Sequence, residues 1–524
     1  MADKSSRSII REEAFEVVHE LPEVLACQDE LLKKSKNLLH EENLVAWIPP
    51  VESGDGIVNV RVSSRSSKIE CIPPRPKGNP GVVFYIFRAF YRRHLKQYGI
   101  MRQVTQWTWR KAYTVYLNYI NVHFFNRKEK IWRPLINLSA FVEKNLIPVC
   151  KLAEAAIVET PKPKVYPSCE QGFLISPHDR YTFPEIFVAI IKKTMIYGGT
   201  NMVLVDGNVV CHDLYDFERD STSEELHGRI LIDPKYCRIR WLSHDEEPES
   251  IAEAATFVDA CAANYAHWMT EVMPRVVLFC ADERFKGVPI VVNEGLHQNI
   301  MNSLFMVVGA DREIVTLPIG RALTVGKLYL TSATGYVPFE RRSNKLSDHS
   351  HGVFSPRAFE VLVQHLSELG RNIKDNAWPE KIFLRRNSEV RKITNVIELE
   401  KFLVTRGYVI VEPEKLTFTQ QVKLFSNAKI IVGSAGAAWI NMLFAPHDAK
   451  IFILISKNPA TSYWYWQNIA CASGKTVNYV LGKINSSRSS GVHADFMIDL
   501  ESFSQALDEE LILEQPIKRK DNEN

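Results

Sequence analysis

The feature that most constrains the fold is a regular alternation of apolar runs and amphipathic segments in the C-terminal third of the chain. Helical patterns separate the first three runs, and a predicted helix start follows each of the first two strands, in the order expected for βα units. Such alternation is typical of parallel strands joined by right-handed crossovers, so this part is predicted to be an α/β, doubly wound sheet. The predicted strands are 381–386, 408–411, 429–432 and 450–455.

Two helix starts in this region have the spacing of a capping box. Asn395 precedes Glu398, and Thr417 precedes Gln420, by three positions. In a capping box the first side chain accepts from the backbone of the fourth residue, whose own side chain bonds back. Gly407 is predicted to end the first of these helices.

Small residues follow the strand predicted at 429–432, from Gly433 to Ala437. Ligands of such sheets bind beyond the carboxyl ends of the strands, where free N–H groups and a helix start favour phosphate. The loop has neither dinucleotide nor P-loop spacing, and close helix packing is the alternative explanation. Arg385 and Arg386 leave a neighbouring strand at the same edge, where they could bind diphosphate or form surface salt bridges.

A second candidate site lies in the helical pattern at 264–280. His267 and Glu271 are four residues apart and share one helical face. A carboxylate beside an imidazole raises its basicity, so His267 is a candidate general base; an ordinary side-chain hydrogen bond is the alternative. No zinc-ligand spacing accompanies the pair and the chain has no D-x-D triplet, so no metal site is predicted.

Composition places the chain among ordinary globular proteins of two or three domains. Of its 524 residues, 46% are hydrophobic and 24% charged, and the net charge of +3 does not indicate a polyanion-binding protein. Nine scattered cysteines without a CxxC pair fit a reducing compartment. Neither a signal peptide nor a membrane span is predicted, so the expected location is the cytoplasm.

The N-terminal part differs in texture from the rest. Residues 1–80 are predicted to be a helical and linker extension, and 81–150 a basic, aromatic helical region. Residues 71–128 contain no acidic side chain, so they are predicted to bind an anionic membrane surface, or to pack as a solvated basic helix. Nucleic acid is not predicted as a partner because no binding motif is present, and the oligomeric state is left open.

From about residue 150 the pattern becomes mixed α/β. A hairpin is predicted with its turn at Asp206 and Gly207, and further strands in "GRILID", "VPIVVN" and "KLYLTSA". The predicted domains are 151–345 and 346–500, followed by a C-terminal helix and disordered tail at 501–524.

Four ordered blocks resemble glycosyltransferase family 61, over roughly residues 170–500. The resemblance is to the DUF563-like type that builds capsular and other surface polysaccharides. The blocks are "NYAHWMTEVMPR" (264–275), "FLRRNSEVRKITNVIEL" (383–399), residues 407–437, and "NMLFAP" (441–446) with the later "HADF" (493–496).

The resemblance implies a GT-B fold, with two Rossmann-like domains facing a cleft. The first (151–345) would present the acceptor and the second (346–500) would bind a nucleotide sugar, usually a UDP-sugar. The implied reaction is an inverting, metal-independent hexosyl or pentosyl transfer to a hydroxyl of a glycan or lipid-linked saccharide in polysaccharide biosynthesis, at the inner face of the membrane. The implied base is His267 or Glu271, and the implied donor-binding residues are Arg385, Arg386, Glu414, Gly433, Ser434, Ala435, Gly436, Ala437 and Asn441.

One departure from the family pattern affects residues 433–437, the predicted donor loop. Family members usually have G-x-H-G-A, whereas this chain has Ala435 in place of the histidine, and Trp439 in place of a small or aliphatic residue. The alternative is therefore a catalytically silent relative that binds a nucleotide or glycan as an assembly partner. A nicotinamide-dependent oxidoreductase is disfavoured because the dinucleotide glycine fingerprint is absent.

Overall fold

Two large β-sheets organise the part of the chain that the computed structural model describes. The described residues are 132–173, 179–226, 229–241, 248–309, 312–338, 352–370, 378–388, 391–458, 464–484 and 494–512. The predictions for residues 1–131, including the membrane-binding stretch 71–128, lie outside these ranges, as do His493 and the tail from 513 onward.

The C-terminal sheet is parallel and doubly wound, which confirms the prediction for this region. Its strand order is β18-β17-β19-β20-β21, and all of these pairs are parallel. In chain order this is 2-1-3-4-5, so the winding reverses between β17 and β19 and makes a topological switch point there. The strands are β17 (Lys381–Leu384), β18 (Val409–Val411), β19 (Ile430–Ser434), β20 (Lys450–Ser456) and β21 (Asn478–Ile484), with β4 (Lys164–Tyr166) and β22 (Phe496–Met497) beside β21.

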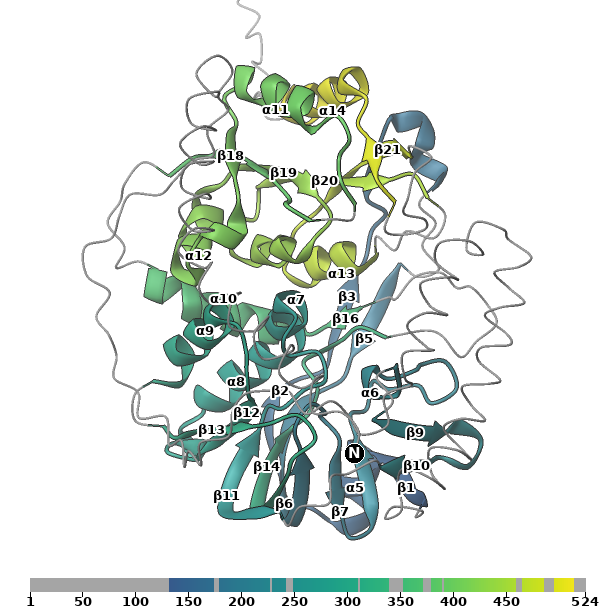
Figure 1. The fold of residues 1–524 in the computed structure, drawn as a ribbon, viewed down its shortest axis with the longest axis vertical. Helices are drawn as coiled ribbons and strands as arrows, with labels where there is room; N and C mark the ends of the chain where they lie inside the picture. The colour runs from purple at the N-terminus through teal and green to yellow at the C-terminus, as the bar shows by residue number, and fades with distance from the viewer. Residues whose placement is uncertain are drawn as a thin grey trace, which may run out of the picture. The chain divides into compact units, whose positions relative to one another are not determined.

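Helices cover both faces of this sheet. In Figure 1, α11 (Val396–Thr405) and α14 (Leu500–Ile512) lie on one face, and α12 (Phe418–Asn427) and α13 (Trp464–Ala472) on the other. The core on the first face joins Phe383, Val432 and Phe452 of the strands to Leu403 and Phe503 of the helices. Burial on both faces explains why these strands are continuous apolar runs in the sequence.

One of the two predicted capping boxes is confirmed and the other is wrong. At α12, Thr417 and Gln420 form the full reciprocal capping box. At α11, Asn395 makes no side-chain cap. Its carboxamide donates to the backbone O of Ile498 at 2.8 Å and accepts from the N–H of Ile498 at 3.1 Å. A tertiary contact therefore replaces the local cap and joins the start of α11 to the segment before α14.

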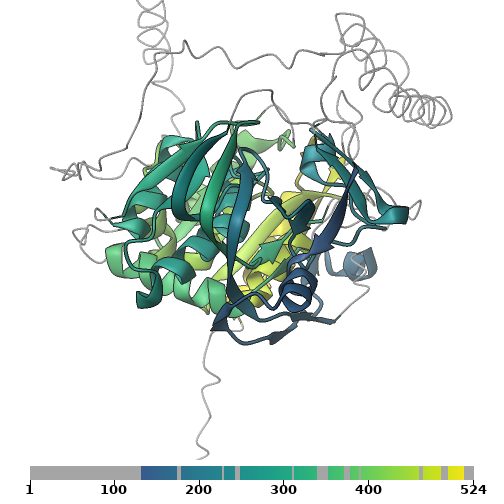
Figure 2. The ribbon, with the colours of Figure 1, turned by 90° about the horizontal axis from the view of Figure 1, so that it is seen from below.

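The larger sheet has eleven strands and is mixed. Its order is β13-β12-β11-β14-β6-β7-β8-β1-β10-β9, with β2 beside β6 (Figures 1 and 2). The block β13-β12-β11-β14 is parallel, and β6, β7 and β8 form an antiparallel meander beside it. Farther along, β1 pairs with β8 in parallel and with β10 antiparallel. The prediction of a Rossmann-like domain at 151–345 therefore fits the parallel block alone. The strands are β1 (Trp132–Asn137), β2 (Val149–Ala153), β6 (Ile186–Tyr197), β7 (Val203–Val205), β8 (Asn208–Cys211), β9 (Ile230–Asp233), β10 (Arg238–Trp241), β11 (Glu249–Thr256), β12 (Ile290–Asn293), β13 (Ile314–Leu317) and β14 (Ala322–Thr331).

The predicted domain limits differ from the structure in two places. The helical region predicted to end at 150 is wrong at 132–137, where β1 lies between β8 and β10, and from Val149, where β2 begins, whereas α5 at Leu138–Asn145 is helical as predicted. Strand pairing and burial of Leu135 outweigh the local helical pattern there. In addition, β4 joins the C-terminal sheet although it precedes most of the larger one. The hairpin turn at Asp206 and Gly207 is confirmed, with φ of 47° and 77°.

The helical segment at 264–280 is confirmed and contains an irregular turn. It consists of α7 (Tyr265–His267), a π-helical turn η5 (Trp268–Val272) and α8 (Met273–Cys280). Asn264 caps its start by accepting from the N–H of Ala266. The other elements are α5 (Leu138–Asn145), α6 (Ser223–Leu226), α9 (Gln298–Val308), α10 (Pro356–Gly370), β3 (Ala156–Glu159), β5 (Arg180–Phe183), β15 (Gly335–Tyr336), β16 (Val353–Phe354), and the 3₁₀ turns η3 (Ser168–Phe173), η4 (Pro234–Tyr236), η6 (Glu283–Phe285), η7 (Pro413–Lys415) and η8 (Ala437–Phe444).

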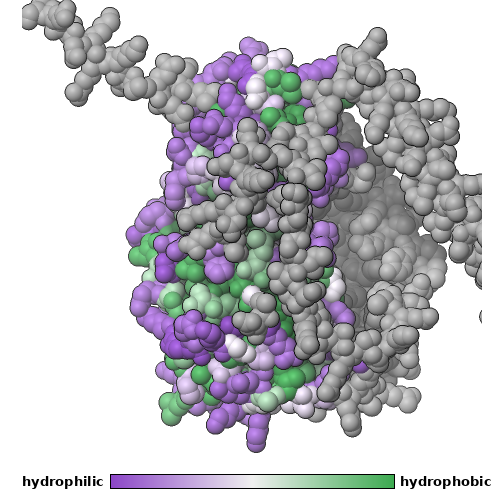
Figure 3. All heavy atoms as spheres, turned by 90° about the vertical axis from the view of Figure 1, so that its left-hand side faces the viewer, coloured by the Kyte–Doolittle hydropathy of each residue, from purple (hydrophilic) through white to green (hydrophobic). Residues whose placement is uncertain are grey.

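The surface mixes polar and apolar side chains. On the face drawn in Figure 3, hydrophilic residues border a group of apolar ones. Single exposed apolar residues, such as Leu146 and Ile397, are usual on globular proteins. Within the described ranges, no helix has the length and apolar character needed to cross a bilayer.

Candidate active site

The helix formed by α7, η5 and α8 brings His267 and Glu271 into contact. The Nδ1 atom of His267 lies 3.1 Å from Oε2 of Glu271, and the two side chains are 16% and 12% exposed. Burial lowers the pKa of His267, but the Glu271 carboxylate outweighs it, and the pKa is raised overall. Burial likewise raises the pKa of Glu271. The carboxylate therefore makes the imidazole more basic, as a general base requires.

A cavity of about 70 Å³ opens beside this pair. His267, Glu271, Asp259 and Arg275 all line it. The Arg275 guanidinium lies within 3.3 Å of Oδ2 of Asp259, and its Nε donates to the backbone O of Glu271 at 2.7 Å. Arg275 thus connects the buried Asp259 carboxylate to the turn that carries Glu271.

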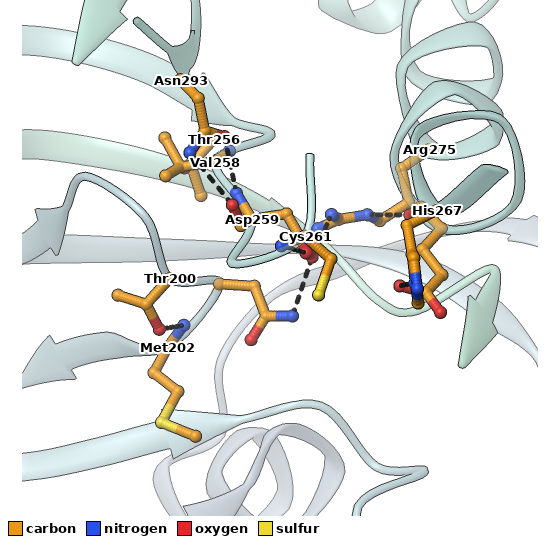
Figure 4. Close-up of polar contacts among 11 residues, drawn as sticks. Thr200, Met202, Thr256, Val258, Asp259, Cys261, His267, Arg275 and Asn293 are labelled. Atoms are coloured by element: carbon orange, nitrogen blue, oxygen red, sulfur yellow. Dashed lines mark hydrogen bonds and ion pairs between the residues drawn. The ribbon is translucent and has the colours of Figure 1, made fainter. Parts of the chain in front are cut away.

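Asp259 lies at the centre of this network, where several hydrogen bonds meet, as Figure 4 shows. Its backbone N–H donates to Asn293, and its carboxylate accepts from the N–H of Cys261, both at 2.9 Å. A further hydrogen bond comes from the side chain of Asn201. Asp259 was not among the predicted site residues, although it lies just beyond the carboxyl end of β11, where side chains of functional importance are expected.

Contacts of the predicted donor loop explain why small residues lie at the end of β19 and just beyond it. A Cβ at Gly433 would lie 2.8 Å from Cβ of Leu384 in β17, so glycine permits the close approach of the two strands. A Cβ at Gly436 would lie 2.1 Å from Nη1 of Arg386. That same Nη1 donates to the backbone O of Ala435 at 3.2 Å. Packing accounts for Gly433, and the contact of an arginine with the loop accounts for Gly436.

The two adjacent arginines have different environments. Arg385 forms a bidentate pair with Glu400, with distances of 2.6 and 2.5 Å, and lies 3.6 Å from Glu412. Hydrogen bonding to Glu400 raises the pKa of Arg385. Because two carboxylates already balance its charge, this geometry does not support the predicted contact of Arg385 with diphosphate.

Arg386 instead lies at the switch point without a carboxylate partner in an ion pair among the described residues. Its Nε and the Nε of Arg391 are buried and make no hydrogen bond within this part of the chain. Burial lowers the pKa of both guanidinium groups, and their proximity lowers that of Arg386 further. The Oγ of Ser434 is also buried and unpaired in the described structure. Unsatisfied donors at one sheet edge are the groups that an anionic ligand would satisfy.

Arg391 was not among the predicted site residues. It occurs five positions after Arg386 in the arginine-rich block and adopts φ of 60°, an uncommon left-handed conformation for a residue other than glycine. Its position within that block is the sequence signal that could have marked it as a candidate site residue. Such strained residues often lie at functional sites.

The other predicted donor residues divide into an exposed and a buried case. Glu414 is exposed beyond β18 and accepts from the side chain of Asn387 at 2.8 Å. Asn441 is fully buried, donates to Gln421 and accepts from the Tyr265 hydroxyl, both at 2.7 Å. These contacts do not support a donor contact for Asn441; they join η8, which follows the donor loop, to α7, which carries His267.

The two residues that depart from the family pattern, Ala435 and Trp439, have ordinary packing environments. Trp439 is fully buried and donates from Nε1 to the backbone O of Ser434 at 3.0 Å. It therefore holds the loop from within. Ala435 is partly exposed and Ala437 exposed, so neither adds a polar side chain. Among the described residues, no group of three or more His, Cys, Asp or Glu side chains could hold a metal ion. Metal independence stays a prediction.

Comparison with known proteins agrees with this arrangement. The sequence model of the Glycosyltransferase 61 family matches residues 265–452, from the helix of His267 to β20. A curated relative, the EGF domain-specific O-linked N-acetylglucosamine transferase of Xenopus laevis, is 32% identical over 123 residues, which is 22% of this chain. The match spans 23% of that relative's length. The family predicted from the sequence blocks is confirmed over residues 265–452, which match glycosyltransferase family 61.

Proposed function

We propose that this protein is an inverting, metal-independent glycosyltransferase that moves a sugar from a UDP-sugar to a hydroxyl acceptor. The observation that carries the proposal is the set of unpaired, buried donors at the switch point of the C-terminal sheet. Arg386 and Arg391 follow β17 and Ser434 ends β19, and the diphosphate of a nucleotide binds beyond the carboxyl ends of such strands in sheets of this topology. Family membership makes a nucleotide sugar the natural ligand for that position.

In the proposed reaction the acceptor oxygen attacks the anomeric carbon as the bond to the diphosphate breaks. His267, with its basicity raised by Glu271, takes the proton of the acceptor hydroxyl. The negative charge that develops on the leaving diphosphate is balanced by Arg386 and Arg391 and by the N–H groups of the loop 433–437. A single displacement inverts the configuration, and two cations at the diphosphate fit a reaction that needs no metal ion.

A GT-B arrangement is part of this proposal. The hydrogen bond between Tyr265 and Asn441 supports it, because it links the segment with the base to the segment after the donor loop. Glu414, exposed beyond β18, is proposed to meet the ribose or uracil. Location in the cytoplasm, at the inner face of the membrane through residues 71–128, belongs to the proposal as well.

Two acceptor classes are compatible with this chemistry. The family resemblance favours a glycan or lipid-linked saccharide of a surface polysaccharide. The name of the Xenopus relative, which is specific for EGF domains and O-linked, makes a protein hydroxyl the second candidate. Both present a hydroxyl to the same base, so the donor site can be tested before the acceptor is known.

A thermal-shift screen of the purified full chain against UDP, GDP, CMP and NADH, with EDTA present, tests the donor site. A ligand at 100 times its dissociation constant adds about 2.7 kcal/mol to the free energy of unfolding. We expect UDP to raise the melting temperature most. A shift with NADH alone would refute the proposal, and absence of any shift would contradict the donor site. Stabilisation by UDP without turnover would identify a silent relative.

A further inference from the structure

The cavity beside His267 is also lined by polar groups that the proposed reaction does not use. They include Thr331, at the end of β14, and His212, just after β8. The Oγ1 of Thr331 and the Nδ1 of His212 are buried and have no hydrogen-bond partner within the described structure. Buried polar groups are normally paired, so two unpaired ones facing one cavity indicate a ligand or bound water.

The charges in the wall of this cavity are unsuited to an anionic ligand. Burial lowers the pKa of His212 to about 4, so its imidazole is neutral at pH 7 and has one donor and one acceptor nitrogen. Glu224 is buried in the cavity wall, and burial raises its pKa. Arg275 in the wall is already paired with Asp259, and His267 with Glu271. An anionic ligand would therefore meet carboxyl groups and no free positive charge.

The polar wall of the cavity is held in place, and the space beside it admits several polar groups. Tyr336 packs against the His212 ring, with ring centroids 4.5 Å apart, and its hydroxyl donates to Asp220 at 3.0 Å. The imidazole is thereby held in place. On the same measure as the cavity volume of about 70 Å³, a single water needs only roughly 10–15 Å³. The space is thus sufficient for several hydroxyl-sized groups.

We propose that the part of this cavity beside Thr331 and His212 is an acceptor subsite for an uncharged, hydroxyl-rich group, such as a neutral sugar residue, and that these two side chains bind its hydroxyls. The inference rests on the proposed glycosyl transfer, because it takes His267 as the group that meets the reacting hydroxyl. A neighbouring hydroxyl or hydroxymethyl group of the same sugar then reaches Thr331 and His212 within the one cavity. Neutral sugars fit this site, and uronic acids and sugar phosphates do not.

The matched pair of variants Thr331→Val and Thr334→Val tests the subsite. Both threonines are buried and both have an unpaired Oγ1, but only Thr331 lines the cavity. Each variant removes one hydroxyl at nearly constant volume, so any general effect on the fold is shared. Thermal unfolding of both variants checks that they are folded.

Binding is measured by saturation-transfer NMR, with UDP present, for the methyl glycosides of glucose, galactose and xylose and for glucuronic and galacturonic acids. We expect a neutral glycoside to bind the wild type, the uronic acids to bind more weakly, and Thr331→Val to weaken binding about 2- to 12-fold, the equivalent of one net hydrogen bond. Thr334→Val should leave binding unchanged.

Three results would overturn the inference. The first is tighter binding of uronic acids than of neutral glycosides. The second is equal binding by the wild type and Thr331→Val, which would assign the cavity to water. The third is the absence of glycoside binding by the wild type. Failure of the proposed function is distinguishable, because it would appear as absence of UDP-induced stabilisation while glycosides still bind.

Discussion

Replacing Arg385 with glutamine should destabilise the protein strongly without removing its nucleotide site. The guanidinium forms two hydrogen bonds with Glu400, whose side chain is 5% exposed. Glutamine cannot balance this buried carboxylate, and breaking a buried pair in this way costs about 3–5 kcal/mol. At about 2–4 °C per kcal/mol for a domain of this class, the melting temperature should fall by roughly 6–20 °C.

Arg386→Gln is the matched comparison, because the neighbouring residue has no ion-pair partner to lose among the described residues. Burial already disfavours its charge, so we expect the free energy of unfolding to change by less than about 1 kcal/mol. If Arg386 binds diphosphate, the loss of a charged hydrogen bond of about 1.5–3 kcal/mol should weaken UDP binding about 10- to 150-fold.

Urea unfolding gives the stability of both variants, and calorimetric titration with UDP in EDTA gives the affinity. The expected result is a crossed pattern, in which one variant loses stability and keeps UDP binding while the other does the reverse. If Arg385→Gln is as stable as the wild type and fails to bind UDP, the assignment of the two arginines is refuted. Equal loss of UDP binding in both variants would place both at the diphosphate.

Three further predictions concern the base, the loop and the fold. Glu271→Gln removes the carboxylate that raises the pKa of His267, so the acidic limb of the pH–rate profile should move to lower pH; an unchanged limb would exclude the pairing. Gly436→Ala should displace Arg386 and weaken UDP binding in calorimetry, whereas stability changes little because φ of −174° suits alanine; unchanged affinity would contradict the contact. Asn395→Ala should cost about 1–3 kcal/mol in urea unfolding and leave the UDP-induced shift intact; no loss of stability would contradict its tertiary role.

The sequence predicted the C-terminal sheet well because its signals are local. Apolar runs, the capping box at Thr417 and the position of the loop after β19 all depend on residues close in the chain. Proximity of His267 and Glu271 followed from helical spacing in the same way. These features need no knowledge of what packs against them.

The remaining features depend on contacts between distant segments. Asn395 has the sequence of a cap, but the backbone of Ile498 captures its side chain. Arg385 and Arg386 are indistinguishable in sequence, and only Glu400, fifteen residues away, separates their roles. The strand β1 was predicted as helix because its pairing partners lie far along the chain. Spacing along a helix or strand cannot reveal such partners.

Turnover is the most direct test of metal-independent glycosyl transfer with His267 as the base. Release of UDP is measured for a panel of UDP-sugars, with neutral methyl glycosides as acceptors and EDTA present, for the wild type and for His267→Ala and Arg386→Gln. We expect the wild type to release UDP from at least one donor without metal, and the rate of release to be about 10²–10⁴-fold lower in His267→Ala. Release that requires a divalent metal, or that survives loss of His267, would contradict the proposed mechanism, and absence of release despite UDP binding would contradict the enzyme itself.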